Sequence, residues 1–595
     1  MRLHYPSPRQ LLLMATITSL LGACASTAPV PQPVAAASSP TAARGATEAE
    51  GAAPAEDLLH YERAPMSTEA LEADPMFKVL SAEFAGQREQ MPYAVTQYAA
   101  LAASTRDPAV AERATRIALF AEDDAAALAA AKRWVLLAPT NLDARQLAAT
   151  LHVRAGEVEP AVTHLEYFLA HDRSPDDVKL RTVASLLGRE EEKATALAVM
   201  EKLIADRVSE TDTLLLYAVL ALRADDLESS QRAMDQLVQK ADIKPAIALA
   251  YVTALQREGK REVAMDFLAK ALARTPDEFP LRLLYARFLA ESTRFEQARE
   301  EFLRLDRQEP GNAEVAFALG LLGIETRRLD EAEERFGQLR EHVDYVGSAY
   351  FYLGQIAEMR EQPELALTEY AKVPEGDSYF QAQLRIAILQ GAARKPDEAL
   401  ATLAALQPAD EEQARQHVLV EAEILTSNER LEEAMALLDR SLNGTFDSAL
   451  LYSRAMLAER MNRLDVLEAD LREIITREPE NAEALNALGY TLADRTDRLE
   501  EASGFIRQAL ALNPDSFYVL DSMGWVLFRL GKPEEALPYL EKARALKNDP
   551  EVAAHLGEVL WTLGRQAEAR ALWDSVLKEN PDEPRILKTM QRLVP

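Results

Sequence analysis

Residues 484–514 read ALNALGYTLADRTDRLEEASGFIRQALALNP, and this stretch decides the fold. It holds two segments of helical composition joined by a short polar turn, with Gly489 in the first segment and Ala502 in the second. Pro514 stands twelve residues after Ala502 and ends the second segment, because proline cannot continue a helix. The stretch therefore predicts a pair of antiparallel helices.

The same pattern recurs along the chain at a nearly constant interval. Alanine marks it thirteen times, with gaps of 33 to 35 residues or about twice that value, and Ser230 and Leu467 stand at the two missing marks. The alanines are Ala94, Ala127, Ala161, Ala194, Ala264, Ala298, Ala332, Ala366, Ala399, Ala434, Ala502, Ala536 and Ala569. A period in this range is typical of stacked helical repeats, and about fifteen units result.

Two further offsets support the repeat. Proline stands twelve residues after the mark at Pro139, Pro276, Pro310, Pro479, Pro514 and Pro581. A small residue stands twelve residues before the mark at Ala82, Ala149, Ala218, Ala286, Gly320, Gly354, Ala387, Ala422, Ala455, Gly524 and Gly557, and Gly489 fits with one inserted residue. Small side chains at this position predict a close approach of the two helices.

These units resemble the tetratricopeptide repeat, whose pattern is Leu-Gly in the first helix, a small residue in the second, and a large apolar residue four positions later. Phe336, Tyr370, Leu540 and Trp573 supply that large residue. The resemblance covers residues 75–582 and implies an all-α fold, a right-handed superhelical solenoid of about fifteen helix pairs. Residues 583–595, with a helix over Pro584 to Leu593, are expected to cap the last pair.

The N-terminus carries a targeting pattern. Arg2 and Arg9 precede an apolar run from Leu11 to Leu21, which is too short for a comfortable membrane span. The following Leu21-Gly22-Ala23-Cys24 resembles a bacterial lipobox, which implies a signal peptide over residues 1–23 and lipidation of Cys24, the single cysteine of the chain.

Residues 24–56 consist mainly of Ala, Pro, Ser and Thr and predict a disordered tether, followed by a linker or entry helix over residues 57–74. In Gram-negative lipoproteins, Asp after the lipidated cysteine commonly retains the protein in the inner membrane. Ala25 and Ser26 follow here, so the resemblance implies the periplasmic face of the outer membrane. Sorting signals differ between bacterial groups, which leaves the inner membrane open.

Charge narrows the partners. The chain has 96 acidic and 66 basic residues, a formal net charge of -30, and no long Lys/Arg block follows the signal. This balance disfavours nucleic acid and anionic headgroups. Acidic runs such as Glu190-Glu191-Glu192 and Asp410-Glu411-Glu412 are typical of solvated helix faces.

No catalytic or cofactor motif emerges, and no enzyme activity, cofactor, metal or small-molecule substrate is expected. Gly524 and Gly531-Lys532 suggest a phosphate loop only superficially, because the residues between the glycines have a helical pattern. His152, His164 and His171 fall in one unit and suggest a metal site, but histidines on repeat helices are usually packing or surface residues.

The concave surface remains as a binding site, since in this family it is lined mainly by the first helix of each unit. Positions one and four after the small residue, and three before it, are expected to point inward. They select Phe317, Phe351, Tyr452, Tyr490, Asp521, Trp525, Phe528 and Trp561 as a protein-binding groove. Aromatic residues at helical spacing are also typical of internal packing, so this alternative stays open.

The overall plan of signal, lipobox, tether and long repeat array looks like the outer-membrane lipoprotein partner of a carboxyl-terminal processing protease. That resemblance implies a periplasmic adaptor that docks and activates the protease and presents protein substrates such as cell-wall hydrolases to it. The alternative is an assembly scaffold for an outer-membrane export, secretin or β-barrel machinery, which would use the same surface.

Overall fold

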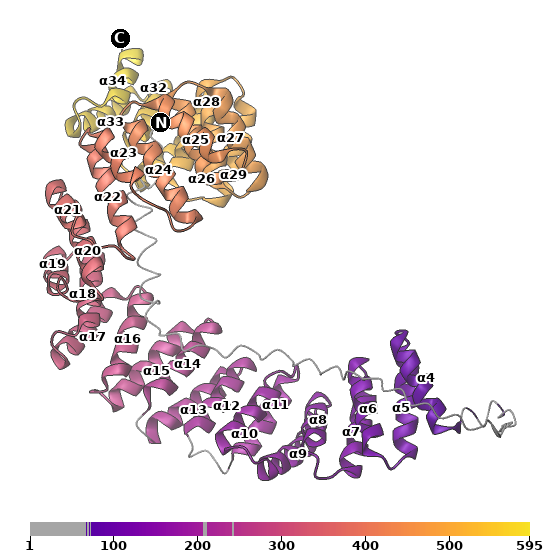
Figure 1. The fold of residues 1–595 in the computed structure, drawn as a ribbon. Helices are drawn as coiled ribbons and strands as arrows, with labels where there is room; N and C mark the ends of the chain where they lie inside the picture. Colours follow the sequence, from indigo (N-terminus) through magenta and orange to yellow (C-terminus); the bar gives the residue numbers. More distant parts are fainter. Residues whose placement is uncertain (1–66, 68–70, 72, 206–210, 241–242, 595) are drawn as a thin grey trace, which may run out of the picture. The chain divides into compact units, whose positions relative to one another are not determined.

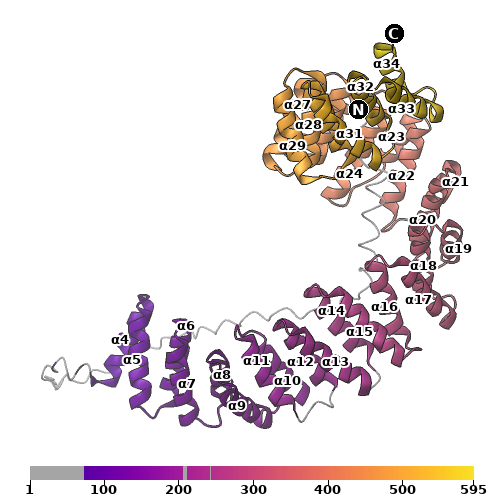
Figure 2. The ribbon, with the colours of Figure 1, turned by 180° about the vertical axis from the view of Figure 1, so that it is seen from behind.

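The computed structural model describes residues 67, 71, 73–205, 211–240 and 243–594. Their regular structure is α-helical throughout, and the helices follow one another as antiparallel pairs (Figures 1 and 2). The described residues fall into two compact units that divide between Pro310 and Gly311. The signal peptide 1–23, Cys24 and the tether 24–56 lie outside the described residues.

The N-terminal unit contains seven helix pairs among the described residues. They are α4 (Pro75–Gln87) with α5 (Met91–Ser104), α6 (Pro108–Phe120) with α7 (Asp124–Leu137), α8 (Leu142–Arg154) with α9 (Val158–His171), α10 (Asp176–Leu187) with α11 (Lys193–Ile204), α12 (Thr211–Arg223) with α13 (Leu227–Lys240), α14 (Pro245–Arg257) with α15 (Arg261–Arg274), and α16 (Phe279–Glu291) with α17 (Phe295–Gln308).

The C-terminal unit adds eight described pairs and one closing helix. They are α18 (Ala313–Glu325) with α19 (Leu329–Gln338), α20 (Val346–Met359) with α21 (Pro363–Tyr370), α22 (Tyr379–Ala392) with α23 (Pro396–Ala404), α24 (Glu411–Ser427) with α25 (Leu431–Leu442), α26 (Ser448–Arg460) with α27 (Leu464–Arg477), α28 (Ala482–Arg495) with α29 (Leu499–Leu512), α30 (Phe517–Arg529) with α31 (Pro533–Leu546), α32 (Pro550–Thr562) with α33 (Gln566–Glu579), and α34 (Pro584–Leu593). The predicted solenoid of about fifteen helix pairs is thereby confirmed.

The repeat marks are the most deeply buried positions of the second helices. Twelve of the thirteen predicted alanines are 0% exposed, as is Ser230, and Leu467 is 1% exposed. The prediction is wrong at Ala194, which is exposed, because Ala196 two residues later is buried at 1% exposure and its N–H bonds to the N-cap carbonyl of Glu192. Five residues, Gly188 to Glu192, separate α10 from α11, where three separate α8 from α9, and the longer turn displaces the mark.

The small residue of each first helix lies against the large residue four positions after the mark. A Cβ atom added at Gly354 would lie 2.6 Å from the ring of Tyr370, and one at Gly557 would lie 2.0 Å from Nε1 of Trp573. Both rings are 0% exposed, so the side chains have no room to withdraw. Close approach of the two helices is therefore what the small residue provides.

The ends of the second helices also follow the sequence. Each of the six predicted prolines stands two residues beyond the last residue of a second helix, as Pro514 does after α29 and Pro581 after α33. Helix α34 has the predicted bounds, and its N-cap Glu583 accepts a hydrogen bond from the N–H of Arg585. Ile586 is fully buried and Met590 and Leu593 pack on the core, so α34 closes the last pair.

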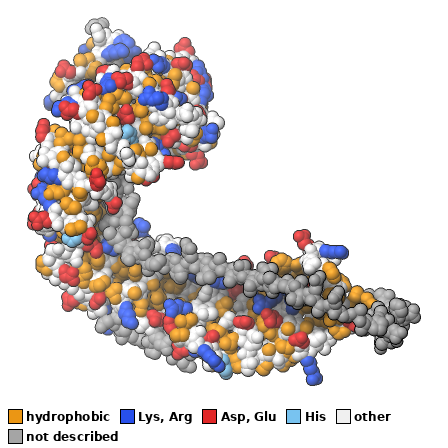
Figure 3. All heavy atoms as spheres, in the orientation of Figure 1, with side chains coloured by type: hydrophobic (Ala, Val, Ile, Leu, Met, Phe, Trp, Pro, Cys, Tyr) orange, Lys and Arg blue, Asp and Glu red, His pale blue; other side chains and the backbone are white. Residues whose placement is uncertain are grey.

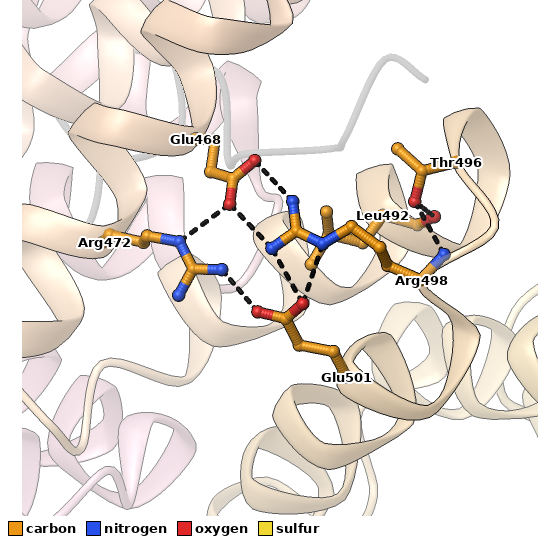
Figure 4. Close-up of polar contacts among 6 residues, drawn as sticks. All are labelled: Glu468, Arg472, Leu492, Thr496, Arg498 and Glu501. Carbon is orange, nitrogen blue, oxygen red and sulfur yellow. Dashed lines mark hydrogen bonds and ion pairs between the residues drawn. The ribbon is translucent and has the colours of Figure 1, made fainter.

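Ion pairs link the second helices of successive units. Arg498, the N-cap of α29, pairs with Glu468 of α27 at 2.8 Å and with Glu501 of its own helix, and Arg472 pairs with the same two carboxylates (Figure 4). Hydrogen bonds from these arginines lower the pKa of both carboxyls. The pairs are solvent-exposed and contribute little individually, about 0 to 1 kcal/mol each, but they favour one register between neighbours.

Charged side chains of both signs are interspersed over the surface of the two units (Figure 3). Within the part of the chain that the structure describes, no helix is long and apolar enough to cross a membrane. Of the predicted entry segment 57–74, only residues 67, 71, 73 and 74 are described, and there the N–H of Leu71 donates to the carbonyl of Ser67, one helical turn back.

A pair of glycine substitutions tests the close approach. Gly557→Ala is expected to lower the free energy of unfolding by about 1–3 kcal/mol, because the new methyl group overlaps the indole of Trp573. Gly504→Ala is the control, since Gly504 lies inside α29 with nothing within 4 Å of its Cβ position, and a gain of about 0.5–1 kcal/mol is expected. Urea unfolding followed by tryptophan fluorescence measures both, and equal effects of the two changes would contradict the packing.

Candidate protein-binding face

The first helices of neighbouring units contact each other and form one side of the array. Within the N-terminal unit, α10, α12, α14 and α16 are in contact in this order. Within the C-terminal unit the same holds for α22, α24 and α26, and for α28, α30 and α32. The positions predicted to line a groove therefore do recur on adjacent helices, and their burial decides which of them a partner can reach.

The C-terminal residues predicted for the groove form a cluster with His555. Nδ1 of His555 lies 3.0 Å from both carboxylate oxygens of Asp521, and both residues are more than nine-tenths buried. The ring of Trp525 stacks on that of His555 with centroids 4.2 Å apart, and Phe528 lies 5.5 Å from Trp525. These side chains connect α30 to α32 and pack against each other.

A second contact in this cluster spans two repeats. The hydroxyl of Tyr490 in α28 donates to Glu551 in α32 at 2.8 Å, and Arg585 of α34 lies 3.5 Å from the same carboxylate. Burial, followed by the nearby charge of Glu551, raises the pKa of Tyr490 well above its usual value, so the hydroxyl stays a donor. The bond links α28 to α32 across the intervening first helix, α30.

The remaining predicted residues also contact their own array. Trp561 is half-buried and stacks on Trp573 at 5.8 Å, while Phe317 is half-buried among Phe336, Tyr345 and Tyr352. Phe351 and Tyr452 are each 6% exposed. Five of the eight predicted residues are thus buried and three half-buried, and their part in binding a partner stays a prediction.

An accessible apolar row lies instead in the N-terminal unit. Leu215, Leu249 and Leu283 stand three residues before the small position of α12, α14 and α16, and Leu249 is 51% exposed. Their spacing of 34 and 34 residues is visible in the sequence, but the groove prediction selected aromatic and acidic side chains at this position and passed over the leucines.

No metal centre emerges from the described residues. Among them, no group of three or more His, Cys, Asp or Glu side chains could hold a metal ion. His152 and His164 stack at 5.4 Å, Nδ1 of His152 lies 2.6 Å from Glu157, and His171 stacks separately on Tyr167. The three histidines of this unit are therefore packing residues in α8 and α9.

Comparisons with known proteins agree with this architecture. Stacked two-helix units define the helical-repeat class of scaffold proteins. A model described as tetratricopeptide repeat matches residues 255–322 and 527–593, and a second with the same description matches residues 317–379 and 452–517. The TPR repeat-containing protein PA4667 of Pseudomonas aeruginosa is 36% identical over 515 residues, which cover 86% of this chain and 86% of that protein. The chain belongs to the tetratricopeptide-repeat protein family.

Solved structures with related folds show lower similarity. The thermophilic TPR protein TTC0263 of Thermus thermophilus is 23% identical and covers 30% of this chain and 100% of its own, with a TM-score of 0.28. The structure of Naa15/Naa10 bound to HypK-THB is 13% identical over 87% of this chain and 99% of that one, with a TM-score of 0.33. Tetratricopeptide repeats are protein-binding modules, and this chain is a scaffold for protein–protein interaction.

The buried histidines give the two units opposite responses to pH. Burial alone would lower the pKa of His555, but the carboxylate of Asp521 raises it above 6.5, so the pair stabilises α30 and α32 at low pH and this contribution is lost as the pH rises through the folded pKa. Burial lowers the pKa of His164 to about 4, so α8 and α9 lose stability as the pH falls from 6.5 towards 4.

Hydrogen exchange between pH 5 and 8.5, corrected for the intrinsic rate at each pH, measures these trends helix by helix. We expect protection in α30 and α32 to fall at the alkaline end and protection in α8 and α9 to fall at the acid end. His555→Gln should remove the alkaline trend and leave the acid trend in α8 and α9 unchanged. A parallel response of both helix pairs would be inconsistent with the two environments.

Proposed function

We propose that this protein is a lipid-anchored periplasmic adaptor that docks a carboxyl-terminal processing protease, activates it and presents protein substrates such as cell-wall hydrolases to it. The observation that carries the proposal is the architecture itself. Every described helix pair belongs to one repeat array, and the buried titratable side chains are engaged in packing contacts between helices. Such an array offers binding surface, and the chemistry is left to a partner.

The location in the cell envelope rests on the sequence. Leu21-Gly22-Ala23-Cys24 has the form of a lipobox, and the Ala/Pro/Ser/Thr composition of residues 24–56 suits a spacer between a lipid and a folded array. As a coil of about 32 residues, the tether would span roughly 30 Å, which keeps the array within reach of membrane-bound and soluble periplasmic proteins alike.

Capture from cell envelopes tests the adaptor role. The tagged protein is recovered from gently solubilised envelopes beside a Cys24→Ala variant, which cannot be lipidated, and the captured proteins are identified by mass spectrometry. We expect a periplasmic protease with the lipidated protein, and faster degradation of a candidate cell-wall hydrolase when the purified scaffold is added to that protease. Recovery of an export pore or a barrel-assembly component without a protease would contradict the adaptor and favour an assembly scaffold.

A further inference from the structure

Two first helices of the N-terminal unit present the same combination of side chains on one face. In each, an apolar residue, a small or β-branched residue and an arginine follow at intervals of four, so they lie one above the other. The residues are Leu215, Val219 and Arg223 in α12, and Leu249, Thr253 and Arg257 in α14. Both arginines and Leu249 are exposed, and Leu215, Val219 and Thr253 are half-buried.

The neighbouring helices extend this surface by one residue at each end. Leu283 of α16 continues the apolar row, and Arg189, which follows α10, continues the basic row. Arg189, Arg223 and Arg257 each stand four residues before the first residue of their unit's second helix, at intervals of 34 residues. Helices α10 to α16 lie side by side in Figures 1 and 2, and the two rows form what we name the leucine–arginine face.

The three arginines of this face differ from their equivalents in the C-terminal unit. There, Arg460, Arg495 and Arg529 hold the same position, and each reaches back to the preceding unit, to Glu429 at 3.2 Å, Asn462 at 2.6 Å and the Ala493 carbonyl at 2.6 Å respectively. Among the residues that the structure describes, no side-chain hydrogen bond or ion pair engages Arg189, Arg223 or Arg257.

The acceptors in the preceding turns are engaged elsewhere, which explains the difference. Glu190 stands 33 residues before Arg223 but binds Arg154 at 2.7 Å. Asp226 stands 31 residues before Arg257 but accepts from the N–H of Ser229 at 2.9 Å at the start of α13. Glu291 takes the arginine position in α16 and ends the basic row. A chain with a net charge of -30 thus keeps, within its described part, three exposed and unpaired cations in one line.

The apolar row is open for a related reason. In the C-terminal unit the position of Leu249 is occupied by side chains that neighbouring helices cover, such as Leu384 at 0% and Tyr452 at 6% exposure. In α14 the same position is 51% exposed. A partner could therefore reach apolar and basic rows together in the N-terminal unit, whereas at these C-terminal positions contacts within the array close them.

The spacing of the rows specifies the ligand. Packed helices lie about 8–10 Å apart, and a polyproline II chain advances about 9.3 Å for every three residues. We propose that the leucine–arginine face binds an extended acidic segment of a partner protein, with an apolar residue at every third position and a carboxylate beside it. This proposal rests on the protein-binding role proposed above, but it does not require that the partner be a protease.

A designed peptide tests the proposal with the full chain in mild detergent. The probe is a fluorescein-labelled peptide of four Leu-Glu-Pro repeats, and its affinity is measured by fluorescence anisotropy at 50 and 500 mM NaCl. We expect binding that weakens with salt and falls about tenfold or more in Arg189→Gln/Arg223→Gln/Arg257→Gln, because three charge-assisted contacts are lost. Leu249→Ser should also weaken binding, and replacement of the three arginines by lysine should retain most of it.

A matched triple variant controls for net charge. Arg307, Arg440 and Arg507 are exposed on second helices, and their replacement by Gln changes the charge by the same amount and should leave binding unchanged. Wild-type affinity in the first triple variant, equal losses in both, or undiminished binding of a Leu-Lys-Pro peptide would each overturn the proposal. Tighter binding of a DNA oligonucleotide that the first triple variant loses would also overturn it, in favour of a general polyanion site.

Protease capture and peptide affinity are separate measurements, so the adaptor role and the acidic-segment site can fail independently. Loss of peptide binding with intact protease capture in the wild-type chain would remove only the site. Retained, arginine-dependent peptide binding without any captured protease would remove only the adaptor role.

Discussion

The close approach of the two helices in each pair is the constraint on which the rest of the array depends. It requires a small residue in the first helix where the second presents a large one, as with Gly354 and Tyr370 or Gly557 and Trp573. Because the large residue stands four positions after the buried mark, one contact fixes both the crossing and the register of the pair. The repeated pair then leaves only its outer faces free to differ between units, and stability becomes a sum over neighbouring units.

The outer faces of the first helices differ in how far the array closes on itself. In the C-terminal unit, the bond from Tyr490 to Glu551 passes over one helix to reach the next but one, and His555 and Asp521 join α32 to α30. Such contacts stiffen the unit and consume the side chains that make them. Helices α12, α14 and α16 lack these long aromatic and acidic side chains at the position of Leu249, so the same face stays available there.

Much of the fold was predictable from the sequence because the signal is repeated. The period, the prolines after the second helices and the bounds of α34 all follow from residue types at fixed offsets, and the error at Ala194 arose where a longer turn shifted the register by two residues. The accessibility of the face was not predictable in the same way. Whether Trp525 is exposed depends on His555, 30 residues later and on another helix, and a repeat pattern gives no information on which neighbour covers which side chain.

Net charge misleads for a related physical reason. It averages over a surface on which many arginines are already paired with acids one repeat away, as Arg463 is with Glu432 and Arg498 with Glu468. An arginine in such a pair has little left to offer a ligand, because a new carboxylate would have to compete with one already in place. The arginines that matter for recognition are those whose acid is engaged elsewhere. Glu190 bound to Arg154 leaves Arg223 in that state, so the pairing of one repeat sets the binding capacity of the next.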